Sequence, residues 1–145
     1  PDMLAVAFVM NEDEVIEALK EPFVYVASDG LLNRGQGHPR AAGTFPRVIG
    51  KYVRDEGKLD LLDQLKKMTK LPAKRLKLEK KGELREGMDA DIVIFDYDKI
   101  IDCATFQNPT EKPKGIEYVI IDGKIALEKG SVLNNRLGKA IRRFQ

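Results

Sequence analysis

Two short apolar runs near the start of the chain have the pattern of buried strands. Residues 4–9 read LAVAFV and residues 23–27 read FVYVA, without a charged position in either run. A strand that is apolar at every position is buried on both faces, as in a parallel sheet. Between the runs, residues 11–20 (NEDEVIEALK) have the signs of a helix, with Asn11 as N-cap and acidic residues in the first turn. The pattern therefore predicts a βαβ unit with two parallel strands.

A second helical pattern follows over residues 60–70 (DLLDQLKKMTK), where Asp60 stands at the N-cap position. The residues that its spacing places on the buried face are Leu61, Leu62, Leu65 and Met68. Proline fits the first turn of a helix, so Pro72 can open a further short helix over residues 72–78.

The pattern of the last third of the chain is that of an antiparallel sheet. Three strands are predicted, over residues 91–96 (DIVIFD), 117–122 (EYVIID) and 124–128 (KIALE). Asp122 and Gly123, between the last two strands, form a strong signal for a two-residue hairpin turn.

These patterns divide the chain near residue 80 into two parts. Residues 1–80 form an α/β part and residues 81–145 a β part, whose last residues, 134–144, are expected to be a frayed tail. The two apolar strands need sheet partners at their edges, which residues 1–80 do not supply. We therefore expect sheet neighbours from a missing N-terminal portion or from another chain, and we read the start at Pro1 as cut out of something longer.

The composition indicates a soluble globular domain and excludes several classes of partner. The 145 residues carry 25 Lys and Arg against 23 Asp and Glu, so the net charge of +2 indicates neither a nucleic acid nor an anionic membrane surface as partner. No apolar run is long enough to span a membrane. A single cysteine, Cys103, excludes an internal disulfide and a Cys-based zinc site, which favours the reducing cytoplasm.

Candidate chemistry is concentrated in the loop that follows the second apolar strand. Ser28-Asp29-Gly30 end that strand, and the loop contains His38, the only histidine of the chain. A carboxylate at a strand end can be a reactive group, although Asp-Gly is also ordinary turn chemistry. The glycines of the loop fit neither a P-loop nor a dinucleotide fingerprint, so they indicate only a flexible loop.

Several motifs together resemble the D-aminoacylase, or N-acyl-D-amino-acid deacylase, branch of the amidohydrolase superfamily. They are SDG, GHPRAAGTFPRVIGKYVRDEG, MTKLPAKRLKL, KGELREGMDADIVIFD, TFQNP and GIEYVIIDGKIALEKG, which cover nearly the whole chain. The resemblance implies the last two βα units of a metal-dependent (β/α)8 barrel, with residues 4–9 similar to strand seven and residues 23–27 to strand eight. It also implies that residues 81–145 are part of the small β-sandwich beside the barrel. A whole barrel takes roughly 250 residues, so this chain cannot contain one.

The resemblance implies a zinc-dependent hydrolase that cleaves the amide bond of N-acyl-D-amino acids. Asp29 matches the carboxylate that takes a proton from the metal-bound water and returns it to the leaving amine, and it can share a metal ion as a ligand. Catalytic zinc usually has three protein ligands, so we expect the zinc of the complete family, whose other ligands lie on earlier strands, to be absent from this chain alone.

Three further residues are candidates for contact with the substrate. Met10 follows strand seven and can line a pocket at the same rim as Asp29, or pack in the core. His38 is expected to shape the loop at the mouth of the site rather than to bind metal. Arg40, like Arg47, can pair with a substrate carboxylate through its planar guanidinium group, or form a salt bridge within the scaffold.

Other readings of the sequence remain open. One is another amidohydrolase, such as a dihydroorotase-like or hydantoinase-like enzyme that opens a cyclic amide. A reading from a different class is a non-catalytic structural or assembly module, either one subunit of a split barrel or a remnant that self-associates. Under either reading the uncovered strands predict homo-oligomers or association with a missing N-terminal half.

Overall fold

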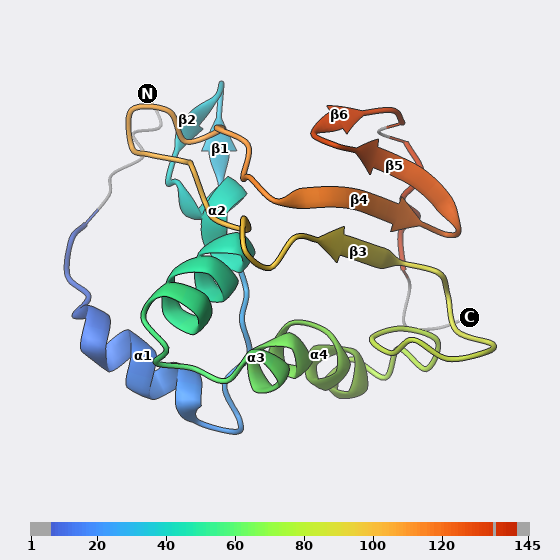
Figure 1. Cartoon of the computed structure of the whole chain (residues 1–145), viewed down its shortest axis with the longest axis horizontal. Coiled ribbons are helices and arrows are strands. Elements are labelled where there is room, and N and C mark those ends of the chain that lie inside the picture. The colour runs from blue at the N-terminus through green and yellow to red at the C-terminus, as the bar shows by residue number, and fades with distance from the viewer. Residues whose placement is uncertain (1–6, 135, 142–145) are drawn as a thin grey trace.

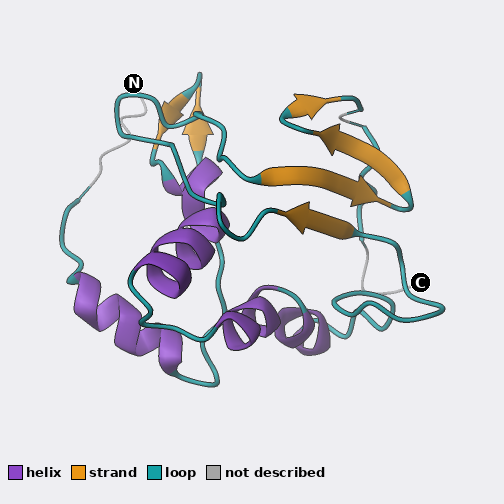
Figure 2. Cartoon of the chain, viewed as in Figure 1, coloured by secondary structure: helices purple, strands orange, loops and turns teal. Residues whose placement is uncertain are grey.

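The computed structural model describes residues 7–134 and 136–141, in which helices come first and an antiparallel sheet follows (Figures 1 and 2). The helices are α1 (Glu12–Lys20), α2 (Arg40–Arg47), the π-helix η1 (Val48–Asp55), α3 (Leu61–Met68) and α4 (Lys70–Arg75). A small hairpin joins β1 (Leu32–Asn33) to β2 (Gln36–Gly37). The larger sheet has the order β3 (Ile92–Phe95), β4 (Ile116–Ile121), β5 (Lys124–Glu128) and β6 (Ser131–Val132).

Helix α1 begins where the sequence predicts it. The side chain of Asn11 accepts a hydrogen bond of 2.9 Å from the backbone N–H of Asp13, and the first turn carries three acidic residues that suit the positive end of the helix dipole. Ile16 and Leu19 are the buried residues of α1. They belong to the helical core, a cluster that also contains Val26, Val48, Tyr52, Val53 and Leu59.

The prediction of two parallel strands is wrong for the residues that the structure describes. Residues 23–27 are extended but pair with no strand, and Val26 instead donates its N–H to the carbonyl of Lys67 at 3.3 Å. Residues 7–9 also lie outside any strand, and the rest of the run over residues 4–9 lies outside the described residues. A strand exists only with a hydrogen-bonding neighbour, and the described part of the chain supplies none here.

Helices α2 and η1 form one continuous rod despite the proline at position 46. Proline lacks the N–H of a regular helix and usually kinks or ends it. Here the helix widens after Pro46 into a π-helix, where Glu56 donates its N–H to the carbonyl of Lys51, five residues earlier, at 2.9 Å. The rod buries Val48, Tyr52 and Val53 in the helical core.

Helix α3 begins at the predicted N-cap, because Asp60 accepts a 2.8 Å hydrogen bond from the N–H of Asp63. The predicted buried face is correct in part: Leu62 is 65% exposed, whereas Gln64 and Lys67 are buried. Leu61 and Met68 are partly buried against the helical core. The short helix α4 contains Pro72, as predicted, and runs from Lys70 to Arg75.

Buried Gln64 and Lys67 have a function at the end of α1. Gln64 Nε2 and Lys67 Nζ both donate to the carbonyl oxygen of Leu19, at 3.1 Å and 2.5 Å. The last carbonyls of a helix lack partners within the helix, and the negative end of its dipole favours a cation. The two polar side chains therefore replace solvent at a buried helix terminus, which an apolar side chain cannot do.

The three predicted strands of the β part are confirmed, and a short fourth strand, β6, extends the sheet. The turn between β4 and β5 is the predicted one, with positive φ at Asp122 (52°) and Gly123 (75°), as a two-residue hairpin requires. Adjacent residues of a strand point to opposite faces, and Val93 and Ile94 in β3 are 54% and 47% exposed. The described residues therefore leave apolar side chains exposed on both faces of the sheet.

The two parts of the chain meet where residues 97–102 lie along η1. A Cβ on Gly50 would be only 2.2 Å from the carbonyl oxygen of Ile100, so glycine permits this close approach. Arg54 donates to the carbonyls of Tyr97 and Ile100, at 3.0 Å and 2.7 Å. Ile100 is 1% exposed. The division near residue 80 stays a prediction, and the contact across it is tight.

Candidate functional site

Asp29 and Arg40 form a double contact between the loop after residue 27 and the start of α2. Arg40 Nη2 donates to Asp29 Oδ2 at 2.8 Å, and Arg40 Nε donates to the carbonyl oxygen of Asp29 at 2.9 Å. The planar guanidinium group suits such a pair of acceptors. The Asp29 side chain is 88% exposed, so its carboxylate is accessible from solvent.

The backbone around Asp29 explains why the two residues meet. Asp29 has a positive φ of 43°, a conformation that aspartate tolerates better than most residues. A Cβ on the next residue, Gly30, would lie 2.4 Å from Cα of Ala41. Gly30 thus lets the turn pack directly on the first turn of α2, beside Arg40. Asp29 thus has the predicted turn conformation, and its catalytic role stays a prediction.

His38 supports the start of α2. Its Nδ1 atom accepts a 3.0 Å hydrogen bond from the backbone N–H of Arg40, one of the donors that a helix terminus leaves without a partner. Burial, and then the nearby Arg40 guanidinium, lower the pKa of His38 below its ordinary value of 6.5. The lowered pKa favours the neutral ring, in which Nδ1 can accept this bond.

An aromatic group lies next to His38. The Phe106 ring packs edge-on against the His38 ring with centroids 5.1 Å apart, and against the Phe8 ring at 5.0 Å. A pocket of about 490 Å³ opens between α2 and the segment that contains Phe106. Its lining includes Phe8, His38, Arg40, Arg47, Asp102 and Phe106.

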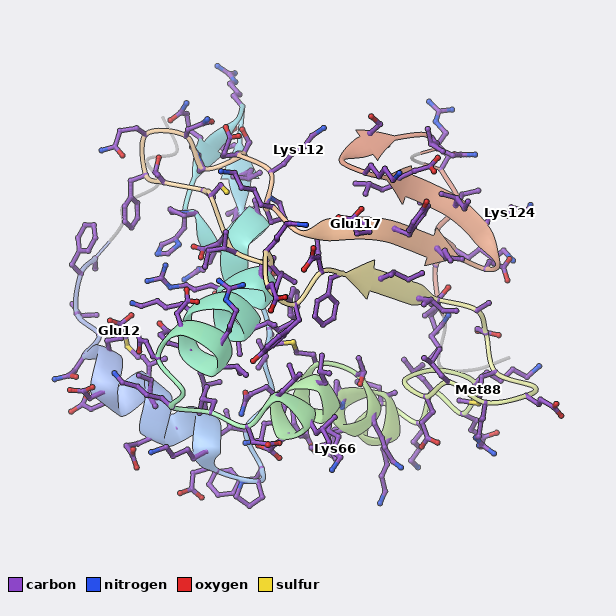
Figure 3. All side chains as sticks on the ribbon, in the orientation of Figure 1. Glu12, Lys66, Met88, Lys112, Glu117 and Lys124 are labelled. Atoms are coloured by element: carbon purple, nitrogen blue, oxygen red, sulfur yellow. The ribbon has the colours of Figure 1, made fainter. Side chains whose placement is uncertain are left out.

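A charged network borders this pocket on the side of α1. Glu12, labelled at the start of α1 in Figure 3, accepts hydrogen bonds from Lys51 Nζ at 2.5 Å and Tyr52 Oη at 2.9 Å. These bonds, with the charges of Lys51 and Arg47, lower the pKa of Glu12 from 4.5 to about 2, against the opposing effect of burial. Arg47 Nη1 also pairs with Asp102 Oδ2 at 3.1 Å. Through Arg47, its last residue, α2 is thus linked to Glu12 in α1 and to Asp102 in the segment after β3.

Three of the four predicted site residues lie together, and one does not. Asp29, His38 and Arg40 are joined by the hydrogen bonds above, whereas Met10 is 75% exposed and does not line the pocket. Within residues 7–134 and 136–141, no three His, Cys, Asp or Glu side chains gather in a group that could hold a metal ion. Cys103 is a half-buried free thiol.

The sequence interpretation missed Asp102 and Phe106. Asp102 pairs with a residue 55 positions earlier, and no local pattern predicts such a contact. Phe106 belongs to the TFQNP motif, which we used for recognition without assigning a role to any of its residues. The loop hairpin β1–β2 was also missed, although Asn33-Arg34-Gly35-Gln36 has a glycine where a tight turn needs positive φ.

The class of protein follows from comparison with known proteins. Residues 12–127 match the Amidohydrolase family, and the chain belongs to this family. The chain is 38% identical to "D-aminoacylase" and 40% identical to "N-acyl-D-glutamate deacylase", both of Alcaligenes xylosoxydans xylosoxydans. Each match runs over 139 residues, which are 96% of this chain but only 29% and 28% of those proteins. The predicted resemblance to the D-aminoacylase branch is confirmed.

Solved structures agree with the sequence matches. A crystal structure of D-aminoacylase superposes with a TM-score of 0.86 at 39% identity, over 90% of this chain and 28% of that one. N-acyl-D-glutamate deacylase of Bordetella bronchiseptica, complexed with zinc and a phosphonate mimic of the tetrahedral intermediate, superposes with a TM-score of 0.85 at 38% identity. That match covers 93% of this chain and 28% of the other. The chain thus has the fold of the corresponding portion of these enzymes and spans a little over a quarter of their length.

In the part of the chain that the structure describes, no helix is both long and apolar enough to cross a lipid bilayer.

Proposed function

We propose that this chain is part of an amidohydrolase that cleaves the amide bond of N-acyl-D-amino acids, and that Asp29 is its general base and acid. The observation that carries the proposal is the Asp29–Arg40 pair, in which an accessible carboxylate lies beside a guanidinium group at one rim. Two curated relatives are named for activities of this kind, which supports the same class of substrate. A simple hydantoin ring has no carboxylate for Arg40 to bind, so over that substrate the geometry favours the linear N-acyl amino acid.

Amide hydrolysis needs a group that accepts a proton from the attacking water and returns it to the leaving nitrogen. Asp29 can exchange protons with a bound substrate because its side chain is exposed. Arg40 donates to both the side chain and the backbone carbonyl of Asp29, and these two bonds hold the carboxylate in one orientation. General acid–base catalysis of this kind contributes about 10²- to 10⁴-fold to the rate.

Arg40 can bind the substrate carboxylate and keep its two hydrogen bonds with Asp29. It has five N–H donors, of which Asp29 takes two in this structure. The remaining donors can hold a second carboxylate beside the first. The neutral ring of His38 fixes the backbone of Arg40 and adds no competing positive charge.

Zinc is proposed for the complete enzyme, in keeping with the zinc complex of the Bordetella relative. Bound zinc acidifies water and polarises a carbonyl group. The described residues do not form such a centre by themselves, so its other ligands must come from outside them. The cytoplasm, with its reducing conditions, stays our proposed compartment because the chain has a single cysteine.

The test is hydrolysis of N-acetyl-D-methionine and N-acetyl-D-glutamate, with added zinc, by the complete protein that carries these residues. Asp29→Asn should lower kcat by about 10²- to 10⁴-fold. The matched control is Asp98→Asn, a change at an exposed aspartate outside the pocket lining, and it should keep full activity. No hydrolysis by the unaltered protein, or hydrolysis unaffected by Asp29→Asn, would contradict the proposal.

The exposed sheet favours a second, non-catalytic candidate, an association module. Val93, Ile94 and Val132 are each about half exposed, on a sheet whose faces the described residues do not cover. An antiparallel sheet commonly leaves one face to solvent, so apolar side chains exposed on both faces favour a partner for this sheet. On this reading the 145-residue chain self-associates, and sedimentation of the isolated chain would show dimers or larger species. A monodisperse monomer would remove this candidate.

A further inference from the structure

A segment from the β part, residues 102–106, lies along helix α2. In Figure 1 the chain leaves β3, passes beside α2, and returns to begin β4. The segment faces α2 at three points, at His38 just before the helix, at the middle of the helix and at its last residue, Arg47. It comes from the opposite side of the predicted boundary near residue 80.

The contact at the middle of α2 leaves no free space. A Cβ on Gly43 would lie 2.9 Å from Cβ of Asp102, closer than ordinary packing allows. The Asp102 side chain is only 12% exposed and pairs with Arg47 at 3.1 Å. A poorly solvated carboxylate needs such a partner, so the ion pair and the close packing fix Asp102 against the helix together.

The contact at the start of α2 reaches the residue that caps Arg40. Phe106 packs against the ring of His38, whose Nδ1 accepts the Arg40 N–H. Edge-on aromatic pairs of this kind stabilise one orientation of both rings. The segment therefore acts on α2 near both of its ends.

Helix α2 transmits this contact to Arg40, its first residue. The core anchors the continuation of this helix in η1, so Asp102 and Phe106 hold the part of the rod that begins with Arg40. A shift of this part at Gly43 or Arg47 displaces the Arg40 guanidinium group, because Gly43 lies about one turn from Arg40. Groups that position a substrate lose much of their effect when they move by about 1 Å. The double contact of Arg40 with Asp29 thus depends on where the β part holds the helix.

We propose that Asp102 is a positioning residue for Arg40, so that the β part determines how the active-site rim binds a substrate carboxylate. The binding of a substrate carboxylate by Arg40 rests on the function proposed above. The effect of Asp102 on the position of α2 is independent of that function and can be measured without a substrate.

The first measurement is an NMR spectrum of the 145-residue chain that resolves the Arg40 Nε–H. This proton should exchange slowly with water because it donates to Asp29. Asp102→Asn keeps the shape of the side chain and removes its charge, and it should speed the exchange by about tenfold or more, whereas Asp98→Asn should not. Unchanged exchange in Asp102→Asn would overturn the proposal. If that variant fails to fold, Arg47→Gln removes the other half of the ion pair. This change also removes the pair of Arg47 with Glu12, so Glu12→Gln is its control and should leave the exchange unchanged.

The second measurement is kinetic and uses the complete protein. Asp102→Asn should raise KM about tenfold for N-acetyl-D-methionine and leave KM unchanged for its carboxamide analogue, which has no carboxylate for Arg40 to bind. Equal effects on both substrates would mean a merely structural role and would overturn the proposal. Absence of hydrolysis by the unaltered protein would contradict the proposed function. The exchange experiment would then be the only test of the positioning role of Asp102.

Discussion

The helical part and the sheet of this chain differ in how they bury their apolar residues. Helices α1, α2–η1 and α3 enclose a cluster of seven buried residues drawn from positions 16 to 59. In the sheet only Ala126 is buried, and all six residues of β4 are half-buried. The sheet has an equally apolar sequence but lacks a layer on either face among the described residues.

The two parts of the chain are therefore stabilised by different interactions. The helical part is stabilised by its own core, since burial of apolar surface contributes about 25 cal/mol per Å². The sheet is ordered mainly by its hydrogen-bonded ladder and by residues 97–102, which attach it to η1. In the isolated chain, substitutions in the helical part and at the attachment should therefore be costly, and substitutions on the sheet faces should not.

The largest effect is expected at the attachment itself. Ile100→Ala removes a side chain that is 1% exposed and should lower the free energy of unfolding by about 3 kcal/mol. The matched control is Ile94→Ala, at a site 47% exposed on the sheet, which should cost less than about 1 kcal/mol in the isolated chain. Urea unfolding of both variants would measure the difference. Equal costs would contradict the contrast between the two regions.

A smaller loss is expected when the two parts are pushed apart. Gly50→Ala places a Cβ 2.2 Å from the carbonyl oxygen of Ile100, so η1 and residues 97–102 must separate, at a cost of about 2 kcal/mol. Gly138→Ala meets no neighbour within 4 Å and serves as the control in the same urea experiment. If Gly50→Ala proved as stable as the control, the close approach described here would be wrong.

The smallest effect should depend on pH. The pKa of Glu12 is lowered from 4.5 to about 2, so its contribution to stability is complete above pH 4.5 and is lost as the pH falls toward 2. Glu12→Gln should cost about 1 kcal/mol at pH 7, a modest value because the side chain is half exposed, and almost nothing near pH 2. Glu14→Gln, at a neighbouring exposed position, is the control. Thermal unfolding at pH 7, 4 and 2 would show whether the difference disappears.

Local signals were sufficient for part of this fold. The N-cap of α1 at Asn11, the N-cap of α3 at Asp60 and the hairpin turn at Asp122 and Gly123 are each determined by a few adjacent residues, and all three were predicted. Family motifs predicted the branch of the amidohydrolases and drew attention to Asp29, His38 and Arg40.

Errors arose where a residue depends on distant parts of the chain. The most buried residues of α3 were not predicted, because Gln64 and Lys67 are buried where they donate to the carbonyl of Leu19, about 45 residues away. Residues 23–27 have the composition of a strand, but a strand also needs a neighbour that sequence pattern alone cannot supply. The pairing of Asp102 with Arg47 could not be predicted either, because the two residues are far apart in the sequence.

The edge strand β3 has a further consequence, for aggregation. Its outer edge is unpaired among the described residues, and its sequence, Ile-Val-Ile-Phe, combines high β-propensity with no charge, which is the signature of segments that stack into cross-β fibrils. Asp91 and Asp96 flank it directly, where charged residues act as gatekeepers against such stacking. Acidification, which neutralises these two carboxylates, would therefore turn β3 into a nucleus for fibrils.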